Sequence, residues 1–205
     1  MRPLLSLLLI LTIFSCEETP EWETVPSGAG ALTPFFFKGF SGDKSYLLWQ
    51  ESGAYKSTTL KFAAWEGKQW GKAREIWTGR DWFVNWADFP AMCEFREGQW
   101  AAHFLEKSAE DTYAYGVRLL FSNDGGDLWR GPVIPHERET DTEHGFVSLL
   151  SWKKKLLAVW LDGRGYALAD SLSDSIPYAG QMHLRAAQFN EQGKKEKEWL
   201  LDCLG

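Results

Sequence analysis

The sequence predicts an all-β fold of three repeated units, each forming four antiparallel strands like the blades of a β-propeller. Apolar segments recur 56 residues apart at Phe35–Phe37, Ala91–Cys93 and Val147–Leu149. A second set recurs at spacings of 55 and 56 residues, namely Trp49, Phe104 and Trp160. The 205 residues include 12 Trp and 13 Phe, which suit half-buried sheets, and no stretch has the apolar spacing of a helix. Three units are too few to close a ring, so the fold expected is a partial propeller, half of a six-bladed one.

Alternating apolar residues, separated by turns such as Glu97-Gly98, indicate four strands in each unit. In the first unit, residues 31–80, they are expected at Pro34–Phe40, Ser45–Gln50, Thr58–Trp65 and Trp70–Trp77. In the second, residues 81–137, they are expected at Phe89–Phe95, Gln99–Glu106, Tyr113–Phe121 and Trp129–Ile134. In the third, residues 138–205, they are expected at Gly145–Trp152, Lys155–Leu161, Met182–Phe189 and Glu196–Leu201.

The first 16 residues have the pattern of a secretion signal. Met1-Arg2 supplies positive charge, and the apolar run Leu4–Phe14 is too short to span a membrane as a helix. Ile13–Cys16 resembles a bacterial lipoprotein box, which implies lipid attachment at Cys16, membrane anchoring and a place in the cell envelope at the outer membrane or cell surface. The alternative is an ordinary signal with an incidental cysteine. Residues 17–30 are acidic and rich in Thr, Pro, Gly and Ser, which predicts a flexible tether.

Charge and composition exclude several classes of function. The formal net charge of −6 argues against binding nucleic acid, whose phosphates require a basic surface. Only Cys93 and Cys203 remain after the signal, so no disulfide framework is expected, and Cys93 is expected to be a small buried apolar side chain. No spacing of His, Cys and carboxylates indicates a metal, and no cofactor is expected. His103 and His183 lie within predicted strands and are expected to be hydrogen-bonded structural histidines.

One predicted turn carries a recognisable motif. Ser122, Asp124, Gly126 and Trp129 fit the pattern Ser-x-Asp-x-Gly-x-x-Trp, in which an Asx side chain binds the backbone of its own turn and glycine permits positive φ. This pattern is the Asp box, or BNR repeat, of sialidase-like propellers, and we expect a structural role for it. With the segments Asp81–Pro90, Glu143–Ser148 and Leu156–Arg164, the chain resembles the N-terminal half of a sialidase-like, six-bladed propeller lipoprotein.

The order of strands predicts where a site lies. In an antiparallel meander successive connections alternate between the two ends of the sheet, so connections between units share one end with the turns between second and third strands. Polar and aromatic groups concentrate at that end, where ligands are commonly bound. The substrate-binding residues expected there are Arg80, Asp81, Trp82, Asn85, Glu143, His144 and Arg164, and the catalytic residues expected are Asp88 and Asp162. The alternatives are packing between units for the tryptophans and structural pairing for Asp88, His144 and Arg164.

The resemblance implies a glycoside hydrolase of the exo-α-sialidase class that acts on or binds acidic glycans, sialic acid among them. Such enzymes use arginines to grip a carboxylate, an Asp as acid/base and a Tyr–Glu pair as nucleophile. The Arg-Ile-Pro element of authentic sialidases is missing from this chain, whose first strand reads Thr33–Phe37, and no Tyr–Glu pair can be assigned from the sequence. Two alternatives therefore remain: a non-catalytic propeller that binds glycan or protein, and an inactive truncated fragment.

Overall fold

The computed structural model describes residues 24–136, 140–169 and 180–202. Over these residues the chain forms three antiparallel sheets, each with four strands. Blade 1 contains β1 (Ala31–Lys38), β2 (Ser45–Ser52), β3 (Thr58–Ala64) and β4 (Arg74–Gly79). Blade 2 contains β5 (Met92–Arg96), β6 (Gln99–Lys107), β7 (Tyr115–Ser122) and β8 (Arg130–Val133). Blade 3 contains β9 (His144–Trp152), β10 (Lys155–Asp162), β11 (His183–Phe189) and β12 (Lys195–Leu200).

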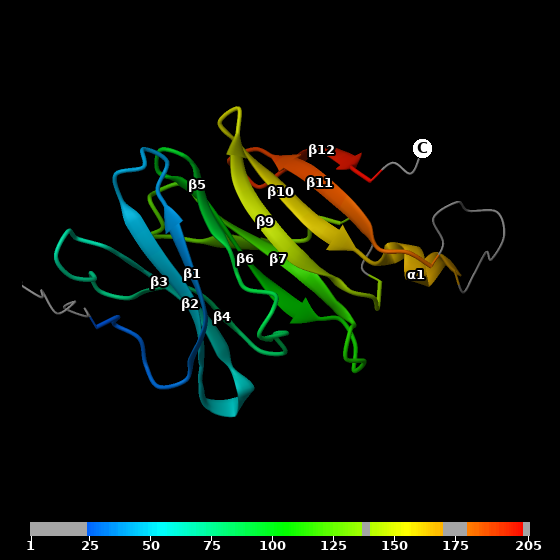
Figure 1. The fold of residues 1–205 in the computed structure, drawn as a ribbon, viewed down its shortest axis with the longest axis horizontal. Helices are drawn as coiled ribbons and strands as arrows, with labels where there is room; N and C mark the ends of the chain where they lie inside the picture. Colours follow the sequence, from blue (N-terminus) through cyan, green and yellow to red (C-terminus); the bar gives the residue numbers. More distant parts are fainter. Residues whose placement is uncertain (1–23, 137–139, 170–179, 203–205) are drawn as a thin grey trace, which may run out of the picture.

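The sheets lie side by side, as Figure 1 shows, from blade 1 in blue and cyan through blade 2 in green to blade 3 in yellow and red. Within each sheet the strands follow chain order, and neighbours pair antiparallel. β5 contacts both β1 and β9, so the first strands of the three blades lie next to one another. The predicted partial β-propeller is therefore confirmed.

All twelve predicted strands are present among the described residues, and most ends differ by three residues or fewer. β4 begins at Arg74 rather than at Trp70, because Trp70 forms an isolated bridge with Trp65 that closes the preceding turn. The helical content is small, as expected: a 3-10 turn, η1 (Ala54–Lys56), and one α-helix, α1 (Arg164–Ala169). The predicted signal with Cys16, residues 17–23 of the predicted tether and Cys203 lie outside the described residues.

Two apolar layers hold the blades together. Leu48, Phe62 and Trp100 belong to the layer between blades 1 and 2, where the Trp100 ring meets Tyr46 edge-on with centroids 4.8 Å apart. Trp160 and Phe121 belong to the layer between blades 2 and 3. Burying such large side chains removes apolar area from water and contributes about 1.5–3 kcal/mol for each one. Phe104 and Trp160, two of the recurring aromatic residues of the sequence, thus contribute to the contacts between neighbouring sheets.

The turn between β7 and β8 is held by side-chain hydrogen bonds. Asp124 Oδ1 accepts the backbone N–H groups of Asp127 and Leu128 at 3.1 and 3.0 Å, and Ser122 Oγ donates to the same oxygen at 2.7 Å. The Trp129 Nε1–H donates to Gly126 O at 3.1 Å. Arg74 of blade 1 donates to Gly125 O at 3.2 Å and pairs with Asp127, so the turn also fastens blade 1 to blade 2.

His103 differs from expectation in its hydrogen bonding, and Cys93 differs in being only partly buried. His103 was expected to be hydrogen-bonded, but it is fully buried and neither ring nitrogen has a partner among the described residues. Burial lowers the pKa of His103 to about 3, so the ring is neutral. Cys93 is a free thiol packed against the apolar layer between blades 2 and 3, and burial raises its pKa to about 12. His183 Nδ1 lies 3.3 Å from Asp202 Oδ2, in keeping with a structural role.

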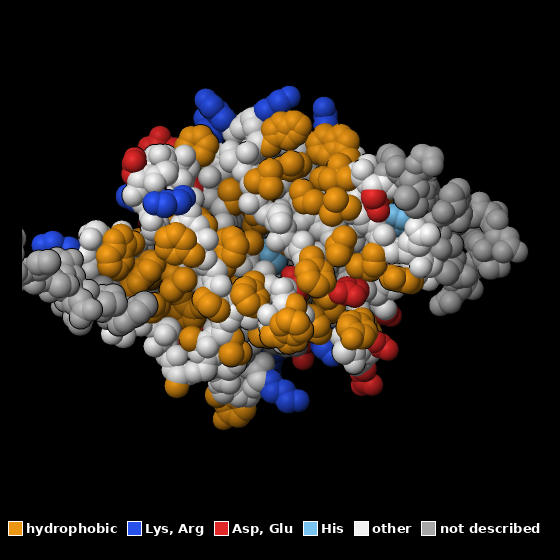
Figure 2. Space-filling model, in the orientation of Figure 1, with side chains coloured by type: hydrophobic (Ala, Val, Ile, Leu, Met, Phe, Trp, Pro, Cys, Tyr) orange, Lys and Arg blue, Asp and Glu red, His pale blue; other side chains and the backbone are white. Residues whose placement is uncertain are grey.

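Hydrophobic side chains also gather on the face of the molecule seen in Figure 2, both around β1 and over blade 3. The large exposed apolar residues on these strands are Leu32, Phe36, Phe146, Leu150, Trp152 and Leu184. Within the described ranges, no helix has the length and apolarity needed to cross a bilayer.

Candidate functional site

The candidate site lies where the β4–β5 connection approaches the beginning of β9. Residues 80–91 form this connection, which contains a turn organised by Asn85. The Asn85 Oδ1 accepts the backbone N–H groups of Ala87 and Asp88, both at 2.7 Å. These two hydrogen bonds to the backbone fix the direction in which Asp88 leaves the turn. Asn85, expected to bind substrate, therefore positions Asp88.

Asp88 connects two blades through its carboxylate. Its side chain comes from the entrance to blade 2, but its Oδ2 accepts the backbone N–H of Phe146 in β9 at 2.8 Å. Gly145 permits this approach, because a Cβ there would overlap Oδ2. Asp88 is only 4% exposed, and its Oδ1 has no partner among the described residues. The carboxyl group is therefore buried, and one of its oxygens is unbonded among the described residues.

The environment of Asp88 makes it a weak acid that can exchange a proton near neutral pH. Burial raises its pKa to about 6, the Phe146 N–H lowers it in part, and the charge of Glu143 raises it further. Carboxyl groups that act as general acids in hydrolysis are tuned in this way, by an apolar environment and a neighbouring charge. The arrangement can thus hold a proton on Asp88 close to a second carboxylate.

Glu143 is partly exposed and is held by a tyrosine. The Tyr115 hydroxyl donates to Glu143 Oε1 at 2.6 Å, and the Tyr115 ring stacks on Phe83 with centroids 3.8 Å apart. Burial, followed by the bond to Glu143, raises the pKa of Tyr115 above its ordinary value. Because the tyrosine is buried and hard to ionise, it positions Glu143 and is poorly suited to be a nucleophile. Glu143 was expected to bind substrate, but its pairing with Tyr115 was not predicted from the sequence.

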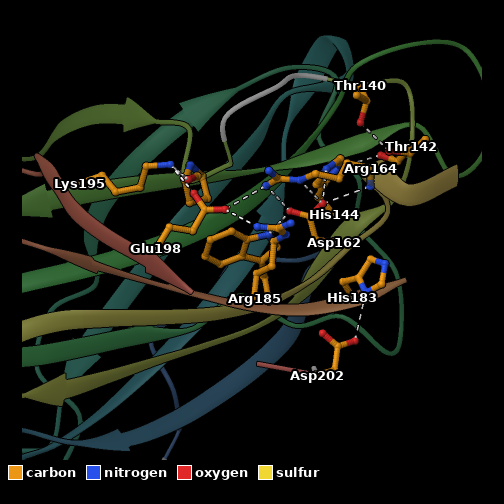
Figure 3. Close-up of polar contacts among 12 residues, drawn as sticks. Thr140, Thr142, His144, Asp162, Arg164, His183, Arg185, Lys195, Glu198 and Asp202 are labelled. Atoms are coloured by element: carbon orange, nitrogen blue, oxygen red, sulfur yellow. Dashed lines mark hydrogen bonds and ion pairs between the residues drawn. The ribbon is translucent and has the colours of Figure 1, made fainter. Parts of the chain in front are cut away.

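Asp162 was expected to be catalytic, but its position does not suit proton transfer to a substrate. The side chain is fully buried, with 0% exposure. Arg164 Nε donates to Asp162 Oδ1 and Arg164 Nη2 to Oδ2, both at 2.7 Å, as Figure 3 shows. Trp160 Nε1 donates to Oδ2 at 2.8 Å, and His144 Nε2 lies 3.5 Å from Oδ1. Asp162 is therefore a positioning residue in the interior.

The charge of Asp162 is stabilised by these partners. Burial alone would raise the pKa of its carboxyl group, but His144 and Arg164 outweigh burial and hold the pKa far below its ordinary value. His144 is itself buried, stacks on His136 with centroids 4.1 Å apart and contacts Thr142 O through Nδ1 at 3.0 Å. His144, like Asp162, is therefore part of the interior rather than of a substrate-binding surface.

Arg164, expected to bind substrate, is also committed to the protein. In addition to the two hydrogen bonds that its guanidinium group donates to Asp162, Arg164 has its Nη2 atom 3.3 Å from Glu198 Oε1. Arg185 and Lys195 bind the same Glu198 carboxylate, at 3.0 and 2.6 Å. Figure 3 shows this group of charges extending from the end of β10 to β12. The network ties α1, β11 and β12 together.

The remaining predicted binding residues are divided between surface and core. Arg80 and Asp81 are exposed at the start of the β4–β5 connection. Trp82 is buried and stacks on Phe104, with centroids 4.1 Å apart and planes within 16°. Trp82 therefore has a packing role, as the alternative for the tryptophans held. Among the predicted binding residues, the exposed Arg80 is the one whose positive charge can reach a ligand. No group of three His, Cys, Asp or Glu within the described ranges is arranged to hold a metal ion.

No family model matches the chain, and no curated protein matches its sequence. Among solved structures, an endo-arabinase from Bacteroides thetaiotaomicron is similar over 88% of this chain and 59% of its own, with 15% identity and a TM-score of 0.51. An α-L-arabinofuranosidase from Fusarium graminearum is similar over 83% of this chain and 48% of its own, with 18% identity and a TM-score of 0.50. The NanB sialidase from Streptococcus pneumoniae is similar over 82% of this chain and 23% of its own, with 16% identity and a TM-score of 0.47.

The chain thus spans about half the length of the endo-arabinase and of the arabinofuranosidase. Identities this low establish the fold and not the activity. The fold of this chain is a partial β-propeller of the kind found in these glycoside hydrolases.

Proposed function

We propose that the chain is the three-bladed part of a glycan-acting propeller in which Asp88 and Glu143 form the acid/base pair of a glycoside hydrolase. The observation that carries this proposal is the state of Asp88, a buried carboxyl group whose Oδ1 is unbonded and whose pKa is raised to about 6 beside Glu143. Glycosidases use two carboxyl groups with different environments, one as acid and one as base or nucleophile. The fold shared with an endo-arabinase and an α-L-arabinofuranosidase is consistent with this proposal.

The substrate class within this proposal is a glycan, and a terminal acidic sugar such as sialic acid remains part of it through the resemblance to sialidases. The structure gives less support to an acidic sugar than the sequence did. Arg164, the arginine expected to grip a carboxylate, already holds Asp162 and Glu198. This occupation of Arg164 argues against its binding a sugar carboxylate. The second candidate function, a propeller that binds glycan without cleaving it, is favoured by the missing Arg-Ile-Pro element.

Hydrolysis of aryl glycosides tests the proposal. The full chain should release the chromophore from an α-L-arabinofuranoside or a sialoside. Glu143→Gln, which keeps the Tyr115 contact but removes the charge, should lower the rate by about 10²- to 10⁴-fold. Exposed Glu75→Gln on β4 serves as the matched control and should leave the rate unchanged. Glycan binding without turnover by the unaltered chain would instead support the non-catalytic propeller.

We further propose that Cys16 carries a lipid and anchors the chain to the cell envelope, on the basis of the N-terminal sequence alone. In cells supplied with labelled palmitate, the full chain should become labelled and fractionate with membranes, and Cys16→Ala should abolish both results. Labelling that persists in the Cys16→Ala variant, or a chain recovered unlabelled in the soluble fraction, would contradict this anchor.

A further inference from the structure

A groove of about 400 Å³ lies between the beginning of β1 and the β4–β5 connection. Its lining is mainly apolar and contains no charged side chain, being formed by Leu32, Thr33, Val84, Asn85, Trp86 and Phe89. Pockets for small ligands usually have volumes of about 300–1,000 Å³. A single sugar ring with part of its neighbour fits such a volume.

Trp86 is the unusual residue of this groove. It is 88% exposed, although tryptophan is normally among the most buried residues on average. Leu32 and Phe89 of the same groove are also exposed, so the site presents an apolar surface to water. The exposure of Trp86 does not result from a loose chain end, because Asn85 Oδ1 binds the backbone on the far side of it, at Ala87 and Asp88.

We propose that this groove is a sugar-binding subsite in which Trp86 stacks on the apolar face of a neutral furanose or pyranose ring. The proposal rests on the proposed function and names the sugar unit that the site takes. A sugar ring offers C–H groups on one face and hydroxyls around its edge. A rigid indole can cover the C–H face without fixing the hydroxyls, and it loses little conformational entropy on binding.

Two features of the lining favour a neutral ring over other ligands. An acidic sugar would need a cation, and the groove lacks one. A wholly apolar ligand would not use the polar side chains of Thr33 and Asn85 in the lining. The chemistry of the groove is therefore amphipathic and uncharged, as a neutral sugar is.

The position of the groove connects it to the carboxylates. Trp86 precedes Asp88 by two residues, so their Cα atoms lie within about 7 Å of each other. Asn85 fixes both residues through one turn. Under the proposed function, the groove therefore holds a sugar unit near the bond that is cleaved.

Binding of neutral oligosaccharides tests this subsite. Calorimetric titration of the full chain with a panel of arabinose, galactose, glucose and mannose trisaccharides should find at least one ligand. Trp86→Ala should weaken its binding about tenfold or more, whereas Trp86→Phe, which keeps an aromatic face, should weaken it less. Tyr55→Ala is the matched control, because Tyr55 is 87% exposed on the turn between β2 and β3 and does not line the groove.

Three results would overturn the subsite: no neutral trisaccharide binds, Trp86→Ala binds as well as the unaltered chain, or Trp86→Ala changes only self-association in sedimentation experiments. The last result would make the groove a contact between proteins. Binding that depends on Trp86 but occurs without hydrolysis would leave the subsite standing and reject the hydrolase. Hydrolysis that is indifferent to Trp86→Ala would reject the subsite alone.

Discussion

Replacing Asp162 with asparagine is expected to lower the free energy of unfolding at pH 7 by about 3 kcal/mol, because it removes the charge that compensates a largely buried arginine. Arg164 keeps its weaker contact with Glu198, which lies 3.3 Å away, so the loss should fall short of complete unfolding. Urea denaturation followed by tryptophan fluorescence measures the change. The matched control is Glu196→Gln, which removes an exposed pair with Lys155 and should leave stability nearly unchanged.

The effect of Asp162→Asn should depend on pH in one direction. The pKa of Asp162 is lowered in the folded protein, so its carboxylate contributes stability above the pKa of the unfolded chain, about 4. That contribution is lost as the pH falls further, and the difference between the variant and the unaltered protein should shrink below pH 4. Equal stability of the two proteins at pH 7 would show that the pairs with His144 and Arg164 do not stabilise the fold.

Replacing Asp88 with asparagine should have the opposite effect on stability. The pKa of Asp88 is raised from 3.8 to about 6, so the folded protein holds a proton that the unfolded chain releases between these values. Stability of the unaltered protein therefore falls as the pH rises through this window. Asparagine keeps an acceptor for the Phe146 N–H without a charge. The variant should be more stable at pH 7 by about 1–2 kcal/mol and should lose this part of the pH dependence.

The same Asp88→Asn variant separates catalysis from folding. Under the proposed function it should lose glycoside hydrolysis by about 10²- to 10⁴-fold while melting at a higher temperature. Asp43→Asn, an exposed change on the turn between β1 and β2, is the matched control and should leave both properties unaltered. A less stable Asp88→Asn protein at pH 7 would mean that the carboxylate is held as an ion, and the acid/base role would then lose its basis.

The strands were predictable because their determinants are local. Alternating apolar residues and glycine-containing turns locate each strand, and the 56-residue recurrence locates each blade. The end of the sheets at which the candidate site lies was predicted from the way successive strand connections alternate between the two ends. The predicted start of β5 at Phe89 was wrong. The strand begins at Met92, because the turn at Asn85 makes the connection longer than the apolar pattern indicates.

The roles of individual residues could not be predicted to the same extent. Asp162 looks like an exposed loop acid in the sequence, but Trp160 and His144 enclose it only once β9 and β10 are paired. The Tyr115–Glu143 pair joins residues 28 positions apart in different blades, and no local sequence pattern predicts it. The parallel bridge between these two residues is a tertiary contact, and such contacts decide which carboxylates remain available.

The two ends of blade 2 are fastened in different directions. At the β7–β8 turn Arg74 attaches blade 1, whereas at the opposite end the Asp88 carboxylate on the entrance to blade 2 attaches blade 3. Blade 2 is thus attached by polar contacts to blade 1 at one end and to blade 3 at the other. Loss of the Arg74 contacts would therefore weaken the attachment of blade 1 at one end of blade 2, while the hydrogen bond between Asp88 and Phe146 would remain at the other end.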